Sequence, residues 1–296
     1  MTALSSLFSI NGQPVASDVL SSNLLDDRGL AFGHGLFETM LFSDAKLPLL
    51  ERHLSRLMLG ANALAIPITI DLINQYLSLF LNQLCSQSIT EGVIKIILTA
   101  GSGGRGYQSP DNIVPTLICS YSAMPAKVQV KSTSSIAVRF CNHRLAVNPA
   151  LAGVKHLNRL DQVIARSEWH CNTYQDGLMF NDSDLLIEAV SANVFLKNNN
   201  GEWLTPRLNQ VGVKGVMRSL LVDEIFPACN ISVSEADIGK TDLDCCQALF
   251  ICNSVKGLMS VGTVYNELNQ QVKSLPVEGQ TLMLCKKLSE CYPHYQ

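Results

Sequence analysis

The second half of the sequence contains a series of short strand-like segments, and this series limits the possible folds more than any other feature. The segments are apolar and rich in β-branched and aromatic side chains, and they read "SIAVRFC", "GLMFN", "LLIEAV", "NVFLKN" and "EWLTP". Short strands with few helices between them do not form the alternating strand–helix units of a parallel, doubly wound sheet. The sequence therefore predicts an α+β fold in place of a doubly wound one.

The first half of the sequence predicts a smaller unit of the same class. Strand-like "LFSIN" and "LFETMLF" precede two stretches with helical apolar spacing, "LLERHLSRLMLGANAL" and "IDLINQYLSLFLNQLC", and two further strands follow at "VIKIILTA" and "TLICSY". The next segment, "SAMPAKVQVKS", has a proline and few core residues, which is typical of a linker. We predict a smaller N-terminal α+β domain over residues 1–121, a linker over 122–130 and a larger C-terminal domain, of short strands with flanking helices, over 131–296.

Composition excludes several classes of function. The chain has 296 residues, of which 47% are apolar and 16% charged, as in a compact protein with a sizeable core. A net charge of -3 and the lack of any Lys/Arg run argue against nucleic acid as a partner. Neither a signal-like start nor a bilayer-length apolar window is present in the sequence, so we expect a cytoplasmic protein with no membrane partner.

The ten cysteines form no C-x-x-C pair and have no histidine at zinc-finger spacing. Most of them lie in apolar segments such as "TLICSY". We therefore expect reduced, mostly buried thiols and no metal site.

A glycine-rich segment, "GSGGRG" at residues 101–106, matches the pattern G-x-G-x-x-G. The dinucleotide-binding form of this pattern requires a helix immediately afterwards, but here two prolines and another strand follow. We therefore interpret the segment as a loop between strands. Arg105 and Tyr107 at its tip are the kind of side chains that a loop carries into a cleft.

A lysine precedes a predicted helix in "GVKHLNRLDQVIAR", residues 153–166. Lys155 can be a solvated lysine, an anchor for an anion, or a partly desolvated amine that forms a Schiff base, and periodicity does not choose among these. We expect Asn158 to cap the helix. We also expect the helix to bury its apolar face, which consists of Leu157, Leu160, Val163 and Ile164.

Residues elsewhere in the chain favour the Schiff-base interpretation. A lysine that holds pyridoxal phosphate needs a carboxylate for the pyridine nitrogen, and helix-start amides with an arginine for the phosphate. Glu188 lies in the apolar run "LLIEAV", where an unpaired carboxylate would be unfavourable. Glycines precede an amphipathic helix that starts at Val216 and Met217, and Arg56 falls on a helix that is otherwise apolar on one side.

The whole pattern resembles the class IV, fold type IV family of pyridoxal-phosphate enzymes. That family includes branched-chain and D-amino acid aminotransferases and an aminodeoxychorismate lyase, and "GSGGRGY" together with "GVKHLNRL" is most similar to the lyase. The resemblance covers nearly the whole chain. In order, it rests on "DRGLAFGHGLFET", "HLSRL", "GSGGRGY", "AGVKHLNRLDQVIAR", "EAVSANVF", "TPRLNQVGVKGVMR" and "ICNS".

The resemblance implies roles for individual residues. Lys155 matches the lysine that bonds the cofactor, Glu188 the partner of the pyridine nitrogen, and Phe37 an aromatic residue of the substrate pocket. For the substrate we expect Arg105 to bind a carboxylate, with Asn253 and Tyr107 lining the pocket. The phosphate site matches Arg56, the amides of Val216 and Met217, and the hydroxyl of Ser254.

Two positions depart from the aminotransferases of this fold. Leu160 stands where they commonly carry a tyrosine that bonds the cofactor, and the pattern E-x-x-x-x-N-L-F is only partly kept between Glu188 and Phe195. Neither departure removes cofactor binding, but the first argues against an ordinary aminotransferase.

The resemblance implies a lyase that turns the dicarboxylate 4-amino-4-deoxychorismate into 4-aminobenzoate and pyruvate, for folate biosynthesis, and that works as a homodimer. One alternative is a class IV aminotransferase of the D-amino acid or branched-chain type. Another is a catalytically silent binding protein that keeps the fold. Retention of Lys155, Glu188 and Arg56 together argues against that second alternative, because a buried lysine and carboxylate without a cofactor are unfavourable. A cofactor-free lysine aldolase would have no need of the phosphate site.

Overall fold

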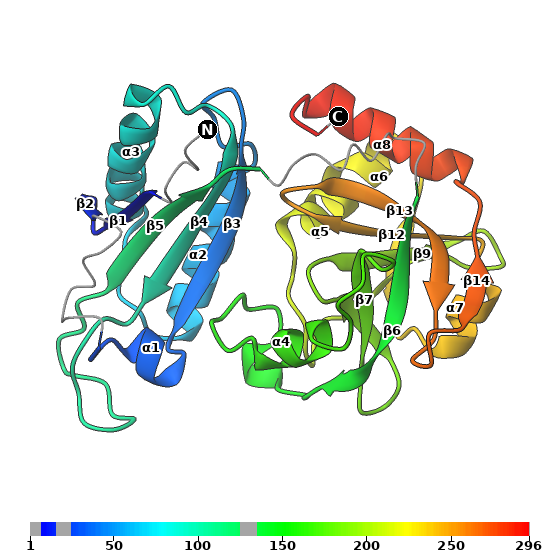
Figure 1. Ribbon diagram of the computed structural model, residues 1–296, viewed down its shortest axis with the longest axis horizontal. Helices are drawn as coiled ribbons and strands as arrows, with labels where there is room; N and C mark the ends of the chain where they lie inside the picture. Colours follow the sequence, from blue (N-terminus) through cyan, green and yellow to red (C-terminus); the bar gives the residue numbers. More distant parts are fainter. Residues whose placement is uncertain (1–6, 16–24, 125–134, 296) are drawn as a thin grey trace. The chain divides into compact units, whose positions relative to one another are not determined.

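The computed structural model describes residues 7–15, 25–124 and 135–295, and the chain forms two compact units (Figure 1). The first unit comprises Met1–Lys127 with Val154–Asn158, and the second comprises Val128–Gly153 with Arg159–Gln296. Both contain helices packed on sheets, so the predicted α+β class is confirmed. The boundaries that we predicted from sequence stay predictions, and residues 125–130 of the predicted linker lie outside the described residues.

The first unit is built on an antiparallel sheet with the strand order β2-β1-β5-β4-β3. β3 lies at one edge of this sheet and pairs with β4 along its full length, with Phe37 opposite Ile97. The strands are β1 (Leu7–Ile10), β2 (Gln13–Val15), β3 (Gly35–Phe42), β4 (Gly92–Thr99) and β5 (Thr116–Ser122).

Two amphipathic helices supply the rest of the first core, as predicted from their periodicity. They are α2 (Leu50–Ala63), which packs on β3, and α3 (Ile70–Ser86), which begins at a Thr69 side-chain cap. A short helix, α1 (Arg28–Phe32), precedes β3. Fully buried side chains from these helices and the sheet meet in one core, among them Met40, Phe42, Leu57, Ile73 and Phe80.

The second unit is built on a mixed sheet with the order β11-β10-β9-β12-β13-β6-β7-β8, and β14 pairs with β13. β6 lies parallel to both β13 and β7, and β10 lies parallel to β11. The strands are β6 (Ile136–Leu145), β7 (Asp176–Asn181), β8 (Leu186–Ala189), β9 (Asn193–Lys197), β10 (Trp203–Pro206), β11 (Val233–Ala236), β12 (Ala248–Asn253), β13 (Gly257–Tyr265) and β14 (Gln271–Ser274).

Helices flank this sheet, as predicted. An aromatic cluster fills part of the core, where Phe195 stacks on Phe250 with ring centroids 4.9 Å apart and Trp203 packs edge-on against Phe226. The helix α8 packs against the turn that joins α5 to α6 (Figure 1). The helical elements are η2 (Pro149–Leu151), α4 (Leu160–Arg166), α5 (Val216–Leu220), the π-helical turn η3 (Leu221–Ile225), α6 (Phe226–Ala228), α7 (Lys240–Cys245) and α8 (Gly279–Cys291).

The helix after Lys155 differs from its prediction in two ways. The apolar side chains that we expected to be buried are exposed, at 73% for Leu160, 60% for Val163 and 48% for Ile164. Helical spacing shows that apolar residues share a face, but it does not show what covers that face. The predicted cap is also wrong, because the N-cap position is Arg159 and the Asn158 side chain donates to the Gly33 carbonyl oxygen instead.

The cysteine prediction is correct only in part. All ten thiols are free, but four of them are buried and four are exposed. Burial raises the pKa of Cys119 to about 11 and that of Cys252 to about 12, so these thiols are unreactive. None of the helices in the described part of the chain has the length and apolar character needed to cross a membrane.

Candidate functional site

Lys155 is held in place by backbone pairing along the edge of the first unit's sheet. The amide of Phe37 donates to the Lys155 carbonyl oxygen at 3.1 Å, and the amide of Leu157 donates to the Gly35 carbonyl oxygen at 2.9 Å. Between them, Leu36 and His156 form an antiparallel bridge. The backbone on both sides of the lysine is therefore attached to a strand, which is the support that a reactive side chain needs.

The side chain of Lys155 lies against Phe37, another predicted site residue. The Lys155 Nζ is 4.1 Å from the centroid of the Phe37 ring, and the Nζ of Lys95 in β4 is 5.2 Å from the same ring. An aromatic face attracts a cation at such distances. The structure thus brings Lys155 and Phe37 together.

Arg56 lies beside a buried carboxylate that the sequence analysis missed. Glu38, which is 1% exposed, accepts from Arg56 Nε at 2.8 Å on Oε1 and from Arg56 Nη2 at 2.5 Å on Oε2. His53 Nδ1 also contacts Glu38 Oε2, at 2.6 Å. A bidentate pair of this kind fixes the plane of a guanidinium. The orientation of Arg56 is therefore set by the β3 residue that follows Phe37.

The charges in this cluster follow from the same contacts. Burial would raise the pKa of Glu38, but the Arg56 charge and the hydrogen bonds from His53 and Arg56 outweigh it and lower that pKa to about 2. Burial lowers the pKa of His53, and the charges of Arg56 and Lys155 act in the same direction against the pull of Glu38. At neutral pH the histidine is thus neutral, with its proton on Nδ1 toward the carboxylate.

The glycine-rich segment forms a loop between β4 and β5, as predicted. The strand β5 follows it, with no helix between, so the interpretation as a loop between strands is confirmed. Arg105 is exposed, and Tyr107 is 88% exposed with its ring 5.4 Å from that of Phe32. Both predicted substrate residues are therefore exposed on the surface of the first unit.

In the second unit, Glu188 is buried and both of its carboxylate oxygens are held. Oε1 accepts from Gln162 Nε2 at 3.1 Å, and Oε2 accepts from the Val213 amide at 2.8 Å. Gly212 has a φ of +93°, and a Cβ there would meet Ile187 at 2.7 Å. A glycine is thus required where this backbone approaches Glu188.

Val216 and Met217 occupy the first turn of α5, as predicted. Their amides stand at helix positions that have no carbonyl partner within the helix. Asn193 Nδ2 donates to the Val213 carbonyl oxygen at 2.9 Å and so ties β9 to the loop before the helix. A Cβ on Gly215 would lie 1.9 Å from Asn193 Oδ1, so this N-cap position also requires glycine.

Asn253 is the last residue of β12, and Ser254 follows it in the turn to β13. Asn253 Oδ1 accepts from the amides of Val255 and Lys256, at 3.1 and 2.8 Å, and so closes the turn. The hydroxyl of Tyr295, which is 8% exposed, donates to the Ser254 carbonyl oxygen at 2.8 Å. The position of Ser254 therefore depends on the end of the chain.

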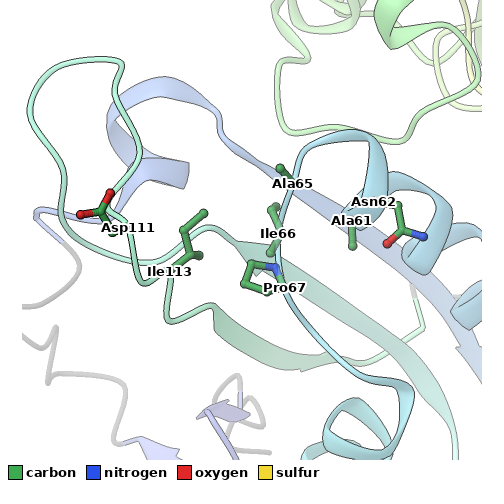
Figure 2. Close-up of a pocket in the computed structure, with 7 residues that line it drawn as sticks. All are labelled: Ala61, Asn62, Ala65, Ile66, Pro67, Asp111 and Ile113. Carbon is green, nitrogen blue, oxygen red and sulfur yellow. The ribbon is translucent and has the colours of Figure 1, made fainter.

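A separate hollow of about 340 Å³ lies in the first unit, after the end of α2 (Figure 2). It has no predicted site residue in its wall, and Asp111 is the one charged residue among those drawn. Within the described ranges, no three His, Cys, Asp or Glu side chains are grouped to hold a metal ion. The lining residues are Ala61, Asn62, Ala65, Ile66, Pro67, Asp111 and Ile113.

Several residues that support the site were missed in the sequence analysis. Glu38 carried a usable signal, because a carboxylate inside the apolar strand "LFETMLF" parallels Glu188 inside "LLIEAV". Asn193 belongs to the E-x-x-x-x-N-L-F pattern, but its bond to the Val213 carbonyl oxygen, 20 residues away, was not predicted. Gln162 and Tyr295 carried no signal for their bonds, because their partners lie 26 and 41 residues away.

Comparisons with known proteins identify the family of the chain. The family model described as amino-transferase class IV matches residues 35–264. The chain is 30% identical to aminodeoxychorismate lyase of Vibrio harveyi over 87% of this chain and 91% of the relative. It is 27% identical to a putative branched-chain-amino-acid aminotransferase of Methanocaldococcus jannaschii over 83% of this chain and 84% of that one.

The solved structures include a similar protein of the same kind. The crystal structure of 4-amino-4-deoxychorismate lyase from Pseudomonas aeruginosa matches with a TM-score of 0.86 and 36% identity, over 97% of this chain and 99% of that one. The fold class predicted from sequence is therefore that of a solved relative.

Proposed function

The chain belongs to the class IV aminotransferase family, and on that premise we propose that it is a lyase that acts on 4-amino-4-deoxychorismate. The products are 4-aminobenzoate and pyruvate. The carbon–oxygen bond to the enolpyruvyl group breaks, the carbon that bears the amino group loses a proton, and the ring becomes aromatic. This reaction belongs to the synthesis of the 4-aminobenzoate part of folates.

One observation carries the choice of a lyase. The similarity to the two lyases, at 30% and 36% identity, extends over nearly the whole of each chain, whereas the aminotransferase relative reaches 27%. Leu160, in the place of the common aminotransferase tyrosine, points in the same direction.

The cofactor of this family is pyridoxal 5′-phosphate, and the residues present fit it. The chain offers an amine in Lys155, a buried carboxylate in Glu188, a fixed guanidinium in Arg56 and the start of α5 for a phosphate. When bound, the cofactor supplies a carbonyl for amines and an electron-withdrawing ring that stabilises negative charge on the neighbouring carbon.

The residues of the chain have two kinds of role: some would hold the cofactor, and one would transfer a proton. Glu188, fixed by Gln162 and the Val213 amide, would hold a proton on the ring nitrogen of the cofactor. Arg56, the amides of Val216 and Met217, and Ser254 would bind its phosphate. Lys155 Nζ would be the base that removes the proton from the substrate carbon that bears the amino group.

The substrate side of the site is a separate part of the proposal. Arg105 pairs with one of the two substrate carboxylates, because a guanidinium matches a carboxylate in a bidentate way. Phe37 lines the pocket beside Lys155, against which its ring lies. Tyr107 and Asn253 line the pocket further out.

The proposal is tested by product analysis. The purified protein with pyridoxal phosphate is given enzymatically generated 4-amino-4-deoxychorismate, without any amino donor, and pyruvate and 4-aminobenzoate are both measured. We expect the two products in equal amounts. Transfer of an amino group from D-alanine or a branched-chain amino acid to 2-oxoglutarate, without pyruvate from 4-amino-4-deoxychorismate, would instead show an aminotransferase. No turnover of either kind would show a silent binding protein.

We also propose a cytoplasmic homodimer. Support for the dimer comes from the family resemblance and from α4, whose apolar side chains Leu160, Val163 and Ile164 are exposed on the single chain. A second copy that covers this face would explain why a short helix carries so many apolar residues. The cytoplasmic location is supported by the free thiols and rests otherwise on composition.

A further inference from the structure

The loop that carries Arg105 contains glycines in backbone conformations that other residues rarely adopt. Its four glycines, Gly101, Gly103, Gly104 and Gly106, all have positive φ, between 58° and 110°. Glycine loses more conformational freedom on ordering than any other residue, so a loop of this kind adopts one shape only when other groups fix it.

Arg28, in α1, is the group that fixes it. Its Nη1 donates to the carbonyl oxygens of Gly103, Gly106 and Gln108 at 3.3, 3.2 and 3.2 Å, and its Nη2 donates to that of Tyr107 at 2.9 Å. Gly104 packs so closely that a Cβ there would lie 3.1 Å from Nη1 and 2.2 Å from the Gln108 carbonyl oxygen. The loop is therefore wrapped around one guanidinium.

The base of Arg28 is fixed independently of the loop. Asp27 caps α1 through the Gly29 amide at 2.7 Å and accepts from Thr99 Oγ1 at 2.7 Å. Arg28 Nε donates to His34 Nδ1 at 3.3 Å, and the opposite nitrogen of that ring contacts the Leu64 carbonyl oxygen at 2.9 Å. The guanidinium thus projects from an anchored position.

Because the Arg28 guanidinium is charged and buried, it depends on the carbonyl oxygens of the loop. The side chain is 3% exposed and makes no ion pair with any residue that the structure describes. Its charge is compensated by loop carbonyl oxygens and by the ring of Phe32, whose centroid is 5.1 Å from Cζ. Any loop conformation that withdraws these carbonyl oxygens would leave Nη1 and Nη2 of a buried cation without the acceptors they have here, which is unfavourable.

The carbonyl oxygens of the loop point toward Arg28, and the Arg105 side chain is exposed. The Gln108 amide donates to the Arg105 carbonyl oxygen at 3.3 Å, and the two residues form an antiparallel bridge. We propose that Arg28 is a positioning residue: it holds the loop in the one shape that presents Arg105 to a carboxylate of the substrate. This inference rests on the proposed function, since Arg105 is assigned to the substrate there.

A double-mutant cycle on KM tests this inference, with amide hydrogen exchange as the second readout. The variants are Arg28→Met, Arg28→Lys, Arg105→Gln and the double variant Arg28→Met/Arg105→Gln. Arg139→Met is the matched control, because Arg139 is equally buried and donates to the carbonyl oxygens of Phe140 and Glu267 in the second unit.

We expect Arg105→Gln to raise KM roughly 10- to 100-fold through loss of a charged hydrogen bond, with kcat changed little. Arg28→Met should raise KM by a similar factor alone but add nothing in the Arg105→Gln background. Arg28→Lys keeps the charge without the planar fork, so it should fall between wild type and Arg28→Met. Amides 103–108 should lose protection in Arg28→Met and keep it in Arg105→Gln and Arg139→Met.

Two results would overturn the inference. KM effects of Arg28→Met and Arg105→Gln that multiply would show that Arg28 acts independently of Arg105, and unchanged protection of the loop in Arg28→Met would show that Arg28 does not order it. Failure of the proposed function is distinguishable from both, because wild type would then release no pyruvate while the exchange of amides 103–108 still reports on Arg28.

Discussion

Glu38 is buried beside one cation, Arg56, and one neutral histidine, His53, and it controls the orientation and protonation of both side chains. Its bidentate contact fixes Arg56, and its contact with His53 Nδ1 determines which ring nitrogen carries the proton. A carboxylate on β3 therefore orders two side chains of α2. Because the neighbouring β3 residue Phe37 contacts Lys155, one strand contacts both the arginine proposed for the phosphate and the lysine proposed as the reactive amine.

Glu38→Gln should lower the free energy of unfolding at pH 7 by about 3 kcal/mol, since it leaves Arg56 without its buried partner. The pKa of Glu38 falls from 4.5 to about 2 on folding, so its stabilisation is complete above pH 4.5 and is lost as the pH falls toward 2. The difference in the free energy of unfolding between wild type and Glu38→Gln should thus be constant from pH 7 to about 5 and become smaller below that. Urea titrations across this range measure it.

The matched control is Asp237→Asn, which breaks the exposed pair with Arg207 and should change stability by less than about 1 kcal/mol. An equal loss in both variants, or a gap that widens in acid, would contradict the account of Glu38.

At the scale of elements, the end of the chain supports the turn between β12 and β13. Tyr295 follows α8, and its hydroxyl bonds the Ser254 carbonyl oxygen. Gly257, at the start of β13, has a φ of +71° and packs on the Tyr295 ring. Ser254, a residue of the proposed phosphate site, is therefore bonded by Tyr295, which lies 41 positions later in the chain.

Tyr295→Phe should weaken binding of pyridoxal phosphate about 2- to 10-fold, as expected for the loss of one hydrogen bond, and leave binding of phosphate-free pyridoxal unchanged. Fluorescence titration with both ligands measures this selectivity. Tyr292→Phe, which removes a hydroxyl bonded to Glu224 on the surface, is the control and should alter neither affinity. Equal weakening of both ligands by Tyr295→Phe would mean that the hydroxyl does not act through the phosphate.

Elements were predicted well from sequence where one segment contains the whole signal. The spacing within α2 and α3 and the strand composition of β3, β4 and β5 specify these elements without distant partners. α4 shows the limit, because its spacing predicted a helix correctly but not the exposure of Leu160. The pairing of residues 154–158 with β3 could not be predicted, since it joins positions about 120 residues apart. The roles of Lys155 and Glu188 came from resemblance, not from periodicity.

The exposed apolar face of α4 is the proposed contact between two copies of the whole molecule. If a second copy covers this face, Leu160→Glu/Val163→Glu should convert a dimer into a monomer, because two charges would be buried without partners. Light scattering should then give a mass that falls from twice the 32.3 kDa of one chain to that value. Leu268→Glu, at an equally exposed leucine of the second unit, should leave the mass unchanged. A wild-type monomer, or a double variant that stays dimeric, would contradict the proposed interface.

We propose that Lys155 is the reactive amine, and the presence of Lys95 beside the same Phe37 ring allows a controlled test. Absorption spectra and pyruvate release are measured for wild type, Lys155→Ala and Lys95→Ala, each with pyridoxal phosphate and 4-amino-4-deoxychorismate. The account predicts that wild type and Lys95→Ala show the visible band of lysine-bound cofactor and form pyruvate, and that Lys155→Ala does neither. A band and pyruvate that persist in Lys155→Ala would contradict it.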